Sequence, residues 1–357
     1  MRKTLNCRKR VPYPGVLFCL WLCFSIILTT QGSQPVNRNE LSVGPYEKSE
    51  IDLAAIPFKI IYETYRETNG KENWELFLMN ADGSNTINLT QTKDIDEMYP
   101  HTSPDGTKVC FVVDEGTGRN KFRNVYYMNI DGTGRVKVAD NARQPCWSPD
   151  GTTIAYVKGE YKRYTVRPFG TKGLFFYNLV TGRHEQHPNK DLHHIFNICW
   201  SPEGKWFVAS VHGGMGFEHT IIAFEAYGTT VCDLSKYGIK GCRPELSPDG
   251  KTIGWAEISE VDVCVADIDL SLLLPRVVDL CSVAKCAKGH FVNHADFSPD
   301  GRYIAFGYGP WANYSVGSKT PGCNICVGDL KGKWIQITTD GMSNKEPDWV
   351  PIVRTNE

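Results

Sequence analysis

Ser103-Pro104-Asp105-Gly106 is the stretch that decides the fold, because it recurs along the whole chain. The further copies are Ser148-Pro149-Asp150-Gly151, Ser201-Pro202-Glu203-Gly204, Ser247-Pro248-Asp249-Gly250 and Ser298-Pro299-Asp300-Gly301. Their serines stand 45, 53, 46 and 51 residues apart, and the degenerate copy Pro347-Asp348-Trp349-Val350-Pro351 follows near the end. A repeat of this length indicates stacked supersecondary units that share a continuous core.

The residues between the turns follow one order in every unit. After each turn comes a β run such as residues 154–157, then a variable loop, a second β run such as residues 174–177, a tight turn and a last short run. Four short strands per unit are the signature of propeller blades. Residues 59–64 are a sixth copy of the run that follows each turn, but no such turn precedes them, and residues 346–349 supply the missing first strand. The sequence therefore predicts an all-β, six-bladed β-propeller of four-stranded blades, closed by N-terminal strands pairing with the C-terminal strand.

The repeat also carries a family resemblance. Pro-x-Trp-Ser-Pro-Asp-Gly at residues 145–151 and Met-Asn-x-Asp-Gly at residues 79–83 and 128–132 resemble the TolB-like β-propeller family, whose repeats are similar to WD40 repeats. The resemblance spans residues 58–351 and implies the fold rather than one function. TolB itself has an additional N-terminal α/β domain. We expect no such domain here, so a role in the Tol envelope system is not carried over.

The N-terminus predicts export. Five basic residues lie in the first ten positions, and no acidic residue occurs before Glu40. The apolar run at residues 16–28 is short for a membrane span and is typical of a signal peptide, although an uncleaved anchor is the alternative. We expect a signal peptide or anchor over 1–33, a linker over 34–57, the propeller over 58–351 and a tail over 352–357. The protein would then be periplasmic, in the cell envelope or extracellular, with membrane contact only through the anchor.

Net charge limits the possible partners, and the cysteine content indicates possible disulfides. Without the five N-terminal bases, 34 basic residues face 40 acidic ones, which argues against a nucleic-acid partner. Ten of the 13 cysteines occur from Cys110 onward, a number compatible with disulfides in an exported domain. The pair expected first is Cys281–Cys286, in a loop, and the second is Cys232–Cys242.

Alignment of the repeats on their serines indicates a ring of polar side chains. Four residues before each serine, or its equivalent, stand Tyr99, Gln144, Asn197, Arg243, His294 and Glu346. Two residues before it stand His101, Cys146, Cys199, Glu245, Asp296 and Asp348, on the same face of the strand. If the first strand of each blade lines the central channel, the first set surrounds its mouth. Capping of loops and binding of water is the alternative role for these side chains.

The two faces of the predicted propeller differ in their loops. The SPDG and Asp-Gly turns share one face, whereas the long, irregular loops gather on the other. Loops on a rigid scaffold often carry function, so we expect binding on the long-loop face, with Tyr161 and Trp311 as flanking anchors of the polar ring.

We expect a monomeric, non-catalytic binding scaffold for a protein or carbohydrate, with no catalytic residue, metal site or cofactor. The alternative is a polysaccharide-active, lyase-like enzyme in which Arg243 neutralises an acidic sugar and His294 acts as a base or metal ligand. Some TolB-like propellers are pectate-oligomer lyases with a metal-binding histidine set, but this sequence shows no clear match to that set. A purely structural envelope protein is a third interpretation. Serine-hydrolase chemistry is excluded because Gly-x-Ser-x-Gly does not occur.

Overall fold

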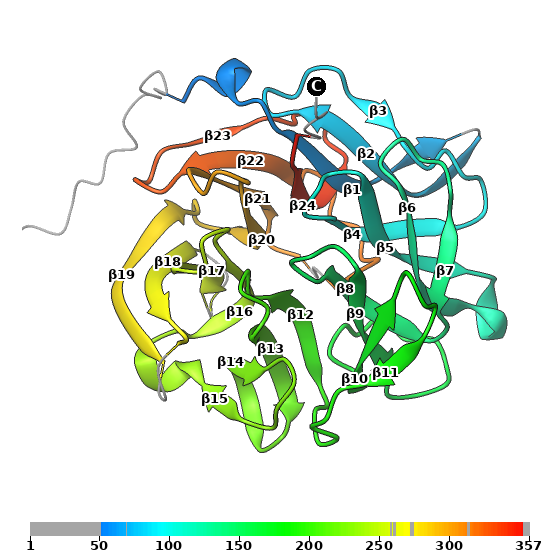
Figure 1. The fold of residues 1–357 in the computed structure, drawn as a ribbon. Helices are drawn as coiled ribbons and strands as arrows, with labels where there is room; N and C mark the ends of the chain where they lie inside the picture. Colours follow the sequence, from blue (N-terminus) through cyan, green and yellow to red (C-terminus); the bar gives the residue numbers. More distant parts are fainter. Residues whose placement is uncertain are drawn as a thin grey trace, which may run out of the picture. The chain divides into compact units, whose positions relative to one another are not determined.

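The computed structural model of this protein describes residues 51–352 except 69, 258, 260–261, 272–274 and 313–314. The expected signal peptide or anchor lies outside these residues. The described chain forms six sheets of four antiparallel strands, and the sheets are arranged as blades of a ring (Figure 1). The predicted six-bladed, four-stranded β-propeller is therefore confirmed.

Each blade uses strands that follow one another in the sequence, except the blade that closes the ring. The closing blade holds β24 (Ser343–Val350), β1 (Lys59–Thr68), β2 (Lys71–Asn80) and β3 (Ile87–Asn88). The second blade holds β4 (Asp96–Thr102), β5 (Lys108–Glu115), β6 (Phe122–Asn129) and β7 (Val136–Ala139). The third holds β8 (Ala142–Trp147), β9 (Thr153–Gly159), β10 (Thr171–Asn178) and β11 (His184–Gln186).

The remaining three blades repeat this plan. The fourth holds β12 (Ile195–Trp200), β13 (Trp206–Gly214), β14 (Phe217–Glu225) and β15 (Val231–Asp233). The fifth holds β16 (Gly241–Leu246), β17 (Thr252–Glu257), β18 (Asp262–Asp269) and β19 (Arg276–Lys285). The sixth holds β20 (His290–Phe297), β21 (Tyr303–Pro310), β22 (Asn324–Asp329) and β23 (Trp334–Gln336).

Closure joins the two ends of the described chain. The C-terminal strand β24 pairs antiparallel with β1, with Lys59 opposite Val350 and Tyr65 opposite Ser343. Figure 1 shows β24, in red, beside the blue β1. The closing blade thus has one strand from the C-terminal side and three from the N-terminal side, as the sequence predicts. This pairing leaves the ring without a gap at which a sheet would expose its edge.

Local hydrogen bonds explain why the SPDG turn recurs. In the first copy the Ser103 hydroxyl accepts the amide of Lys108 at 2.9 Å and donates to Asp105 at 2.5 Å. Asp105 also accepts the amide of Thr107 at 3.0 Å. Gly106 has a φ of +69°, a conformation that glycine adopts without steric cost. Serine, aspartate and glycine thus each satisfy a different requirement of one turn, and the same bonds recur at Ser148, Ser247 and Ser298.

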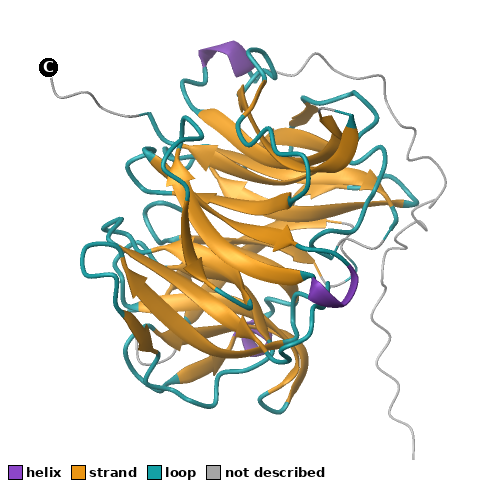
Figure 2. Cartoon of the chain, turned by 90° about the vertical axis from the view of Figure 1, so that its right-hand side faces the viewer, coloured by secondary structure: helices purple, strands orange, loops and turns teal. Residues whose placement is uncertain are grey.

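The apolar core lies mainly between neighbouring blades. Phe176, Trp200, Phe207 and Phe224 form one such cluster, with Phe207 and Phe224 stacked at a ring-centroid distance of 5.2 Å. Strands dominate, and the three helical turns are short: η1 (Leu53–Ala55), η2 (Gly118–Asn120) and η3 (Leu234–Tyr237) (Figure 2). Among the described residues no helix has the length and apolar character needed to cross a bilayer.

Residues 51–57, which the sequence placed in a linker, contact the core of the closing blade. Ile56 is buried and packs in the same cluster as Trp349 and Ile60, while Leu53 packs against its edge. The cysteine expectations are not met in the structure, because all ten cysteines of its described part are thiols. Cys281 lies in β19 rather than in a loop, since the pairing of β18 with β19 continues to Lys285.

Candidate functional site

The six predicted ring residues, here called the inner ring, lie at an irregularity shared by the first strands of all six blades. Each blade shows a register shift at this point, and all six residues have a positive φ, between 42° and 58°. A bulge redirects a side chain away from its regular position in the strand. Left-handed backbone is uncommon for non-glycine residues and costs of order 1 kcal/mol each, so the surrounding contacts must stabilise it.

The structure brings the inner ring together inside the channel. The Tyr99 hydroxyl accepts a hydrogen bond from the Asn197 amide group at 2.9 Å, and the Tyr99 ring meets the His294 ring edge-on. Gln144 accepts the backbone amide of Asn197 at 2.7 Å. All six residues are buried, with exposed fractions of 8% or less. The sequence was sufficient to find this set, but its members contact one another rather than solvent.

Paired charges stabilise the inner ring. Arg243 Nη1 donates to both carboxylate oxygens of Glu346, at 2.7 and 2.9 Å, and His294 Nδ1 lies 3.1 Å from the same carboxylate. Burial raises the pKa of Glu346, but the charge of Arg243 and the His294 hydrogen bond outweigh it and lower that pKa to about 2. Burial lowers the pKa of His294, yet contact with Glu346 leaves it raised overall. Arg243 and His294 are thus engaged by a buried carboxylate, which disfavours the enzyme interpretation built on them.

A second buried ion pair lies beside this one. Lys345 Nζ is 3.2 Å from Glu63 Oε1, and both side chains are fully buried. Glu63 also accepts the backbone amide of Tyr99 at 2.8 Å. Burial raises the pKa of Glu63, and the neighbouring Lys345 opposes that effect. Removing either partner of such a pair would leave an uncompensated charge in the interior.

On the long-loop face, two loops cross the end of the channel. Val316, from the β21–β22 loop, is buried against Tyr99 and Met98, and its carbonyl accepts from Arg123 at 3.3 Å. Arg123 also makes two 2.7 Å bonds to Asp114. Tyr164, from the β9–β10 loop, donates to the same carboxylate at 2.6 Å. These contacts connect three blades and hold Val316 against Tyr99 of the inner ring.

On the opposite face, the channel opens as a funnel of about 350 Å³. The side chains two residues before each SPDG serine, here called the outer ring, include the lining residues His101, Cys199, Glu245, Asp296 and Asp348; Cys146 completes the ring. Six prolines from the turns line its rim, namely Pro104, Pro149, Pro202, Pro248, Pro299 and Pro351. Trp147, Trp200 and Trp349 lie in the wall. The funnel is therefore an acidic cavity with a rigid, apolar rim.

The outer ring holds more acid than base. Asp296 and Glu245 reach the funnel surface, yet protein encloses them on most sides. Burial raises the pKa of Asp296 well above its usual value, and the charges of Asp348 and Glu245 add to the effect. Burial likewise raises the pKa of Glu245, which the charge of His101 opposes. A cationic group entering the funnel would relieve this repulsion.

Outer-ring side chains also join neighbouring blades. Asp348 accepts the backbone amide and the hydroxyl of Thr102, at 2.8 and 2.6 Å. Asp296 accepts the backbone amide of Trp349 at 2.6 Å. One oxygen of each carboxylate thus stabilises the ring of blades, so changes here have to preserve an acceptor if the fold is to be retained.

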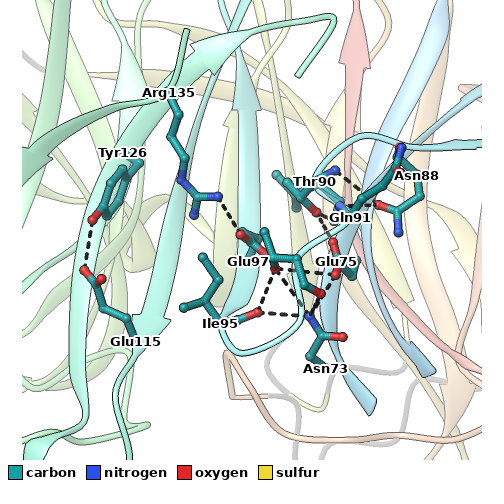
Figure 3. A network of polar contacts seen from close by, with 12 residues as sticks. Asn73, Glu75, Asn88, Thr90, Gln91, Ile95, Glu97, Glu115, Tyr126 and Arg135 are labelled. Atoms are coloured by element: carbon teal, nitrogen blue, oxygen red, sulfur yellow. Dashed lines mark hydrogen bonds and ion pairs between the residues drawn. The ribbon is translucent and has the colours of Figure 1, made fainter. Parts of the chain in front are cut away.

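A further carboxylate pair lies off the axis, between the closing and second blades (Figure 3). Glu75 accepts from Asn73 at 2.8 Å and from Thr90, while Glu97 accepts from Arg135 and from Thr92, both at 2.7 Å. Burial raises the pKa of Glu97 to about 7 despite the Arg135 charge, and burial also raises the pKa of Glu75. The hydrogen bonds of both carboxylates go to neighbouring side chains of these two blades, which indicates a structural role for the pair.

The two predicted aromatic anchors are exposed on the long-loop face. Trp311 is 64% exposed and meets Phe291 edge-on, and Tyr161 is 50% exposed with Arg163 over its ring. They are the only members of the predicted binding set that solvent reaches freely. The sequence pattern had already indicated the outer-ring positions, but it gave no sign that the funnel opens beside the short turns.

The fold is a closed six-bladed β-propeller with an axial funnel. The chain matches no protein-family model. It is 31% identical over 109 residues to a protein TolB homolog of Chlorobaculum tepidum and 31% identical over 113 residues to the Tol-Pal system protein TolB of Alcanivorax borkumensis. These matches cover 29% and 31% of this chain but only 24% and 25% of the relatives, so the chain matches about a quarter of each.

A solved structure of TolB from Acinetobacter baumannii superimposes with a TM-score of 0.61 at 18% identity, covering 83% of this chain and 67% of that one. At this identity the likeness shows the fold. The chain therefore has a six-bladed β-propeller fold like that of TolB, and part of its sequence is similar to TolB relatives, as its repeats predict.

Proposed function

We propose that this protein is an exported, non-catalytic scaffold that binds a protein partner through the funnel on the short-turn face. The observation that carries the proposal is the acidic funnel of about 350 Å³, which opens between six rigid prolines and ends at a buried inner ring. One relative is a Tol-Pal system protein, which supports a protein rather than a small molecule as the partner.

The chemistry of the funnel favours a basic, partly apolar segment of the partner. Burial raises the pKa values of Glu245 and Asp296, and the charge of nearby Asp348 adds to the effect at both. A lysine or arginine side chain would stabilise their ionised forms, while the prolines and tryptophans of the wall would contact its apolar neighbours.

A second candidate surface is the long-loop face that the sequence favoured. Trp311 and Tyr161 are exposed aromatic side chains there, and such residues suit a protein or glycan ligand. In this proposal the inner ring supports the blades that carry the loops, because its own side chains are buried.

Binding of short peptides tests the two surfaces against each other. Fluorescence polarisation would compare labelled peptides that are matched in length but rich in lysine, neutral, or rich in glutamate. We expect the basic peptides to bind, and Glu245→Gln to weaken them by about tenfold, because it removes a negative charge and keeps a similar shape.

The matched control is Trp311→Ala with Tyr161→Ala, on the opposite face. Loss of binding in this pair, with Glu245→Gln unaffected, would move the site to the long-loop face. Absence of any preference for basic peptides would contradict the funnel proposal. Mass spectrometry of the mature N-terminus from the native host would test export separately: cleavage within residues 25–40 supports it.

A further inference from the structure

A cavity of about 760 Å³ lies on the long-loop face, away from the channel, between the third and fourth blades. His193, His194 and Glu160 form part of its lining, with Met215 from the turn between β13 and β14 and Phe217 from the start of β14. The hairpin tip at residues 213–216, which includes the last two residues of β13, is here called the glycine turn because glycine occupies positions 213, 214 and 216. None of these residues takes part in the funnel or in the inner ring.

The hydrogen bonds of the two histidines determine where their protons lie. The backbone amide of Met215 donates to His193 Nε2 at 3.2 Å, so that nitrogen carries no proton. The proton of neutral His193 is therefore on Nδ1, which lies 2.7 Å from His194 Nδ1. His194 Nδ1 accepts it, which leaves the proton of His194 on Nε2, facing Glu160 at 3.5 Å. The four ring nitrogens are thus consistent with one arrangement, in which both imidazoles are neutral.

One additional proton cannot fit this arrangement. A proton added to His193 would lie on Nε2 and would face the N–H of Met215. A proton added to His194 would lie on Nδ1 and would face the N–H of His193, unless His193 moved its own proton to Nε2. Every route therefore breaks either the contact between the histidines or the bond to the glycine turn.

The bond to His193 adds to the hairpin pairing at this turn, in which Gly214 lies opposite Phe217. Met215 has a φ of +53°, an unfavourable conformation for a residue with a side chain. A Cβ on Gly214 would approach His194 Cβ to 2.5 Å, so the turn lies directly against the histidine pair. Loss of the Met215 bond removes a contact that offsets the strain, while Gly213 and Gly216 allow the turn to change conformation.

We propose that the His193–His194 pair is a proton-operated latch, which holds the glycine turn against the cavity at neutral pH and releases it in mild acid. The charged and titratable groups around the pair are Glu160, Lys172, Lys190 and Asp191, with His212 and His219 on the adjoining hairpin. Burial lowers the pKa of His193 and the charge of His194 adds to this, whereas Glu160 and Asp191 oppose it. Because the closed state disfavours the extra proton, falling pH favours the open state.

Metal binding by the two Nδ1 atoms is the competing explanation. It would move the His193 proton to Nε2 and break the same bond to Met215. In addition, no three histidine, cysteine, aspartate or glutamate side chains of the described residues are arranged to hold a metal ion. The geometry therefore favours a change in proton occupancy over a resident metal.

Hydrogen exchange of the full chain, followed by mass spectrometry from pH 8 to pH 5, tests the latch. After correction for the intrinsic exchange rate, we expect the protection of residues 212–218 to fall by up to about tenfold for each pH unit below the pKa of His193. His193→Gln provides an acceptor for Met215 that does not titrate, and we expect it to remove the pH response.

His194→Gln keeps an acceptor for His193 Nδ1, so it should retain a pH response, because His193 still titrates. His219→Gln, in the same hairpin, is the matched control and should behave like the wild type. A flat response in the wild type, or an unchanged response in His193→Gln, would overturn the proposal. Thermal unfolding at pH 8 verifies that each variant is folded. If His193→Gln does not fold, a flat pH response in folded His194→Gln would still overturn the proposal.

Discussion

The inner and outer rings of the channel lie only two residues apart in each first strand, yet their buried carboxylates have different neighbours. In the inner ring Arg243 and His294 contact Glu346, and the pKa of that carboxyl is lowered to about 2. In the outer ring Asp296 lies near Asp348 and Glu245, and its pKa is raised. A buried carboxylate is stable when cations contact it and remains prone to protonation when they do not. The first ring therefore suits a structural role and the second a binding role.

The largest effect is expected from Arg243→Met. This change leaves Glu346, which is fully buried, without the charge that lies closest to it. We expect the free energy of unfolding, measured by denaturant titration, to fall by about 3–5 kcal/mol. Arg302→Met is the matched control, because the Arg302 side chain is 64% exposed in its pair with Asp300 and should contribute less than about 1 kcal/mol. Equal effects of the two changes would contradict the structural role of the inner ring.

Glu97→Gln tests whether a raised carboxyl pKa has the same consequence away from the channel. Since its pKa rises to about 7 on folding, the folded state binds a proton that the unfolded state has lost. The wild type should therefore lose about 3 kcal/mol of unfolding free energy as pH rises from about 4.5 to 7.

The Glu97→Gln variant should lack this part of the pH dependence. The measurement is denaturant unfolding at a series of pH values, with Glu67→Gln as an exposed control. Parallel curves for wild type and Glu97→Gln would show that the carboxyl is already ionised at low pH.

Asp296→Asn applies the same reasoning to the outer ring. Asparagine keeps an oxygen that accepts the Trp349 amide but removes the negative charge. Because the folded pKa of Asp296 is raised, the variant should be more stable than the wild type at neutral pH, by up to about 1.4 kcal/mol for each unit of the shift. The difference should vanish near pH 3, where aspartate is protonated in both states. A variant less stable than the wild type at every pH would mean that the Asp296 carboxylate stabilises the fold, as Glu346 does in the inner ring.

The smallest effect is expected from Trp311→Ala on the long-loop face. The side chain is largely exposed, so thermal unfolding should change by less than about 1 kcal/mol in free energy. A larger loss would mean that its contact with Phe291 holds the β21–β22 loop over the channel. In that case Trp311 on the long-loop face would have a structural role, like the inner ring.

The sequence by itself determined the repeat, the number of blades, their closure and the six inner-ring positions. These features are local or periodic: the hydrogen bonds of Ser103, Asp105 and Gly106 span only a few residues, and each unit repeats them. The sequence also identified Tyr161 and Trp311 as loop aromatics, which the structure finds exposed.

Tertiary structure alone decided which end of the channel opens and how its charges are paired. Val316 packs against Tyr99 and accepts a hydrogen bond from Arg123, 193 residues away, and Arg243 meets Glu346 across 103 residues. The left-handed backbone of the inner ring likewise has no signal in residues as varied as tyrosine, arginine and glutamate. Contacts between residues so far apart follow from the packing of blades and loops, and a repeat pattern carries no record of them.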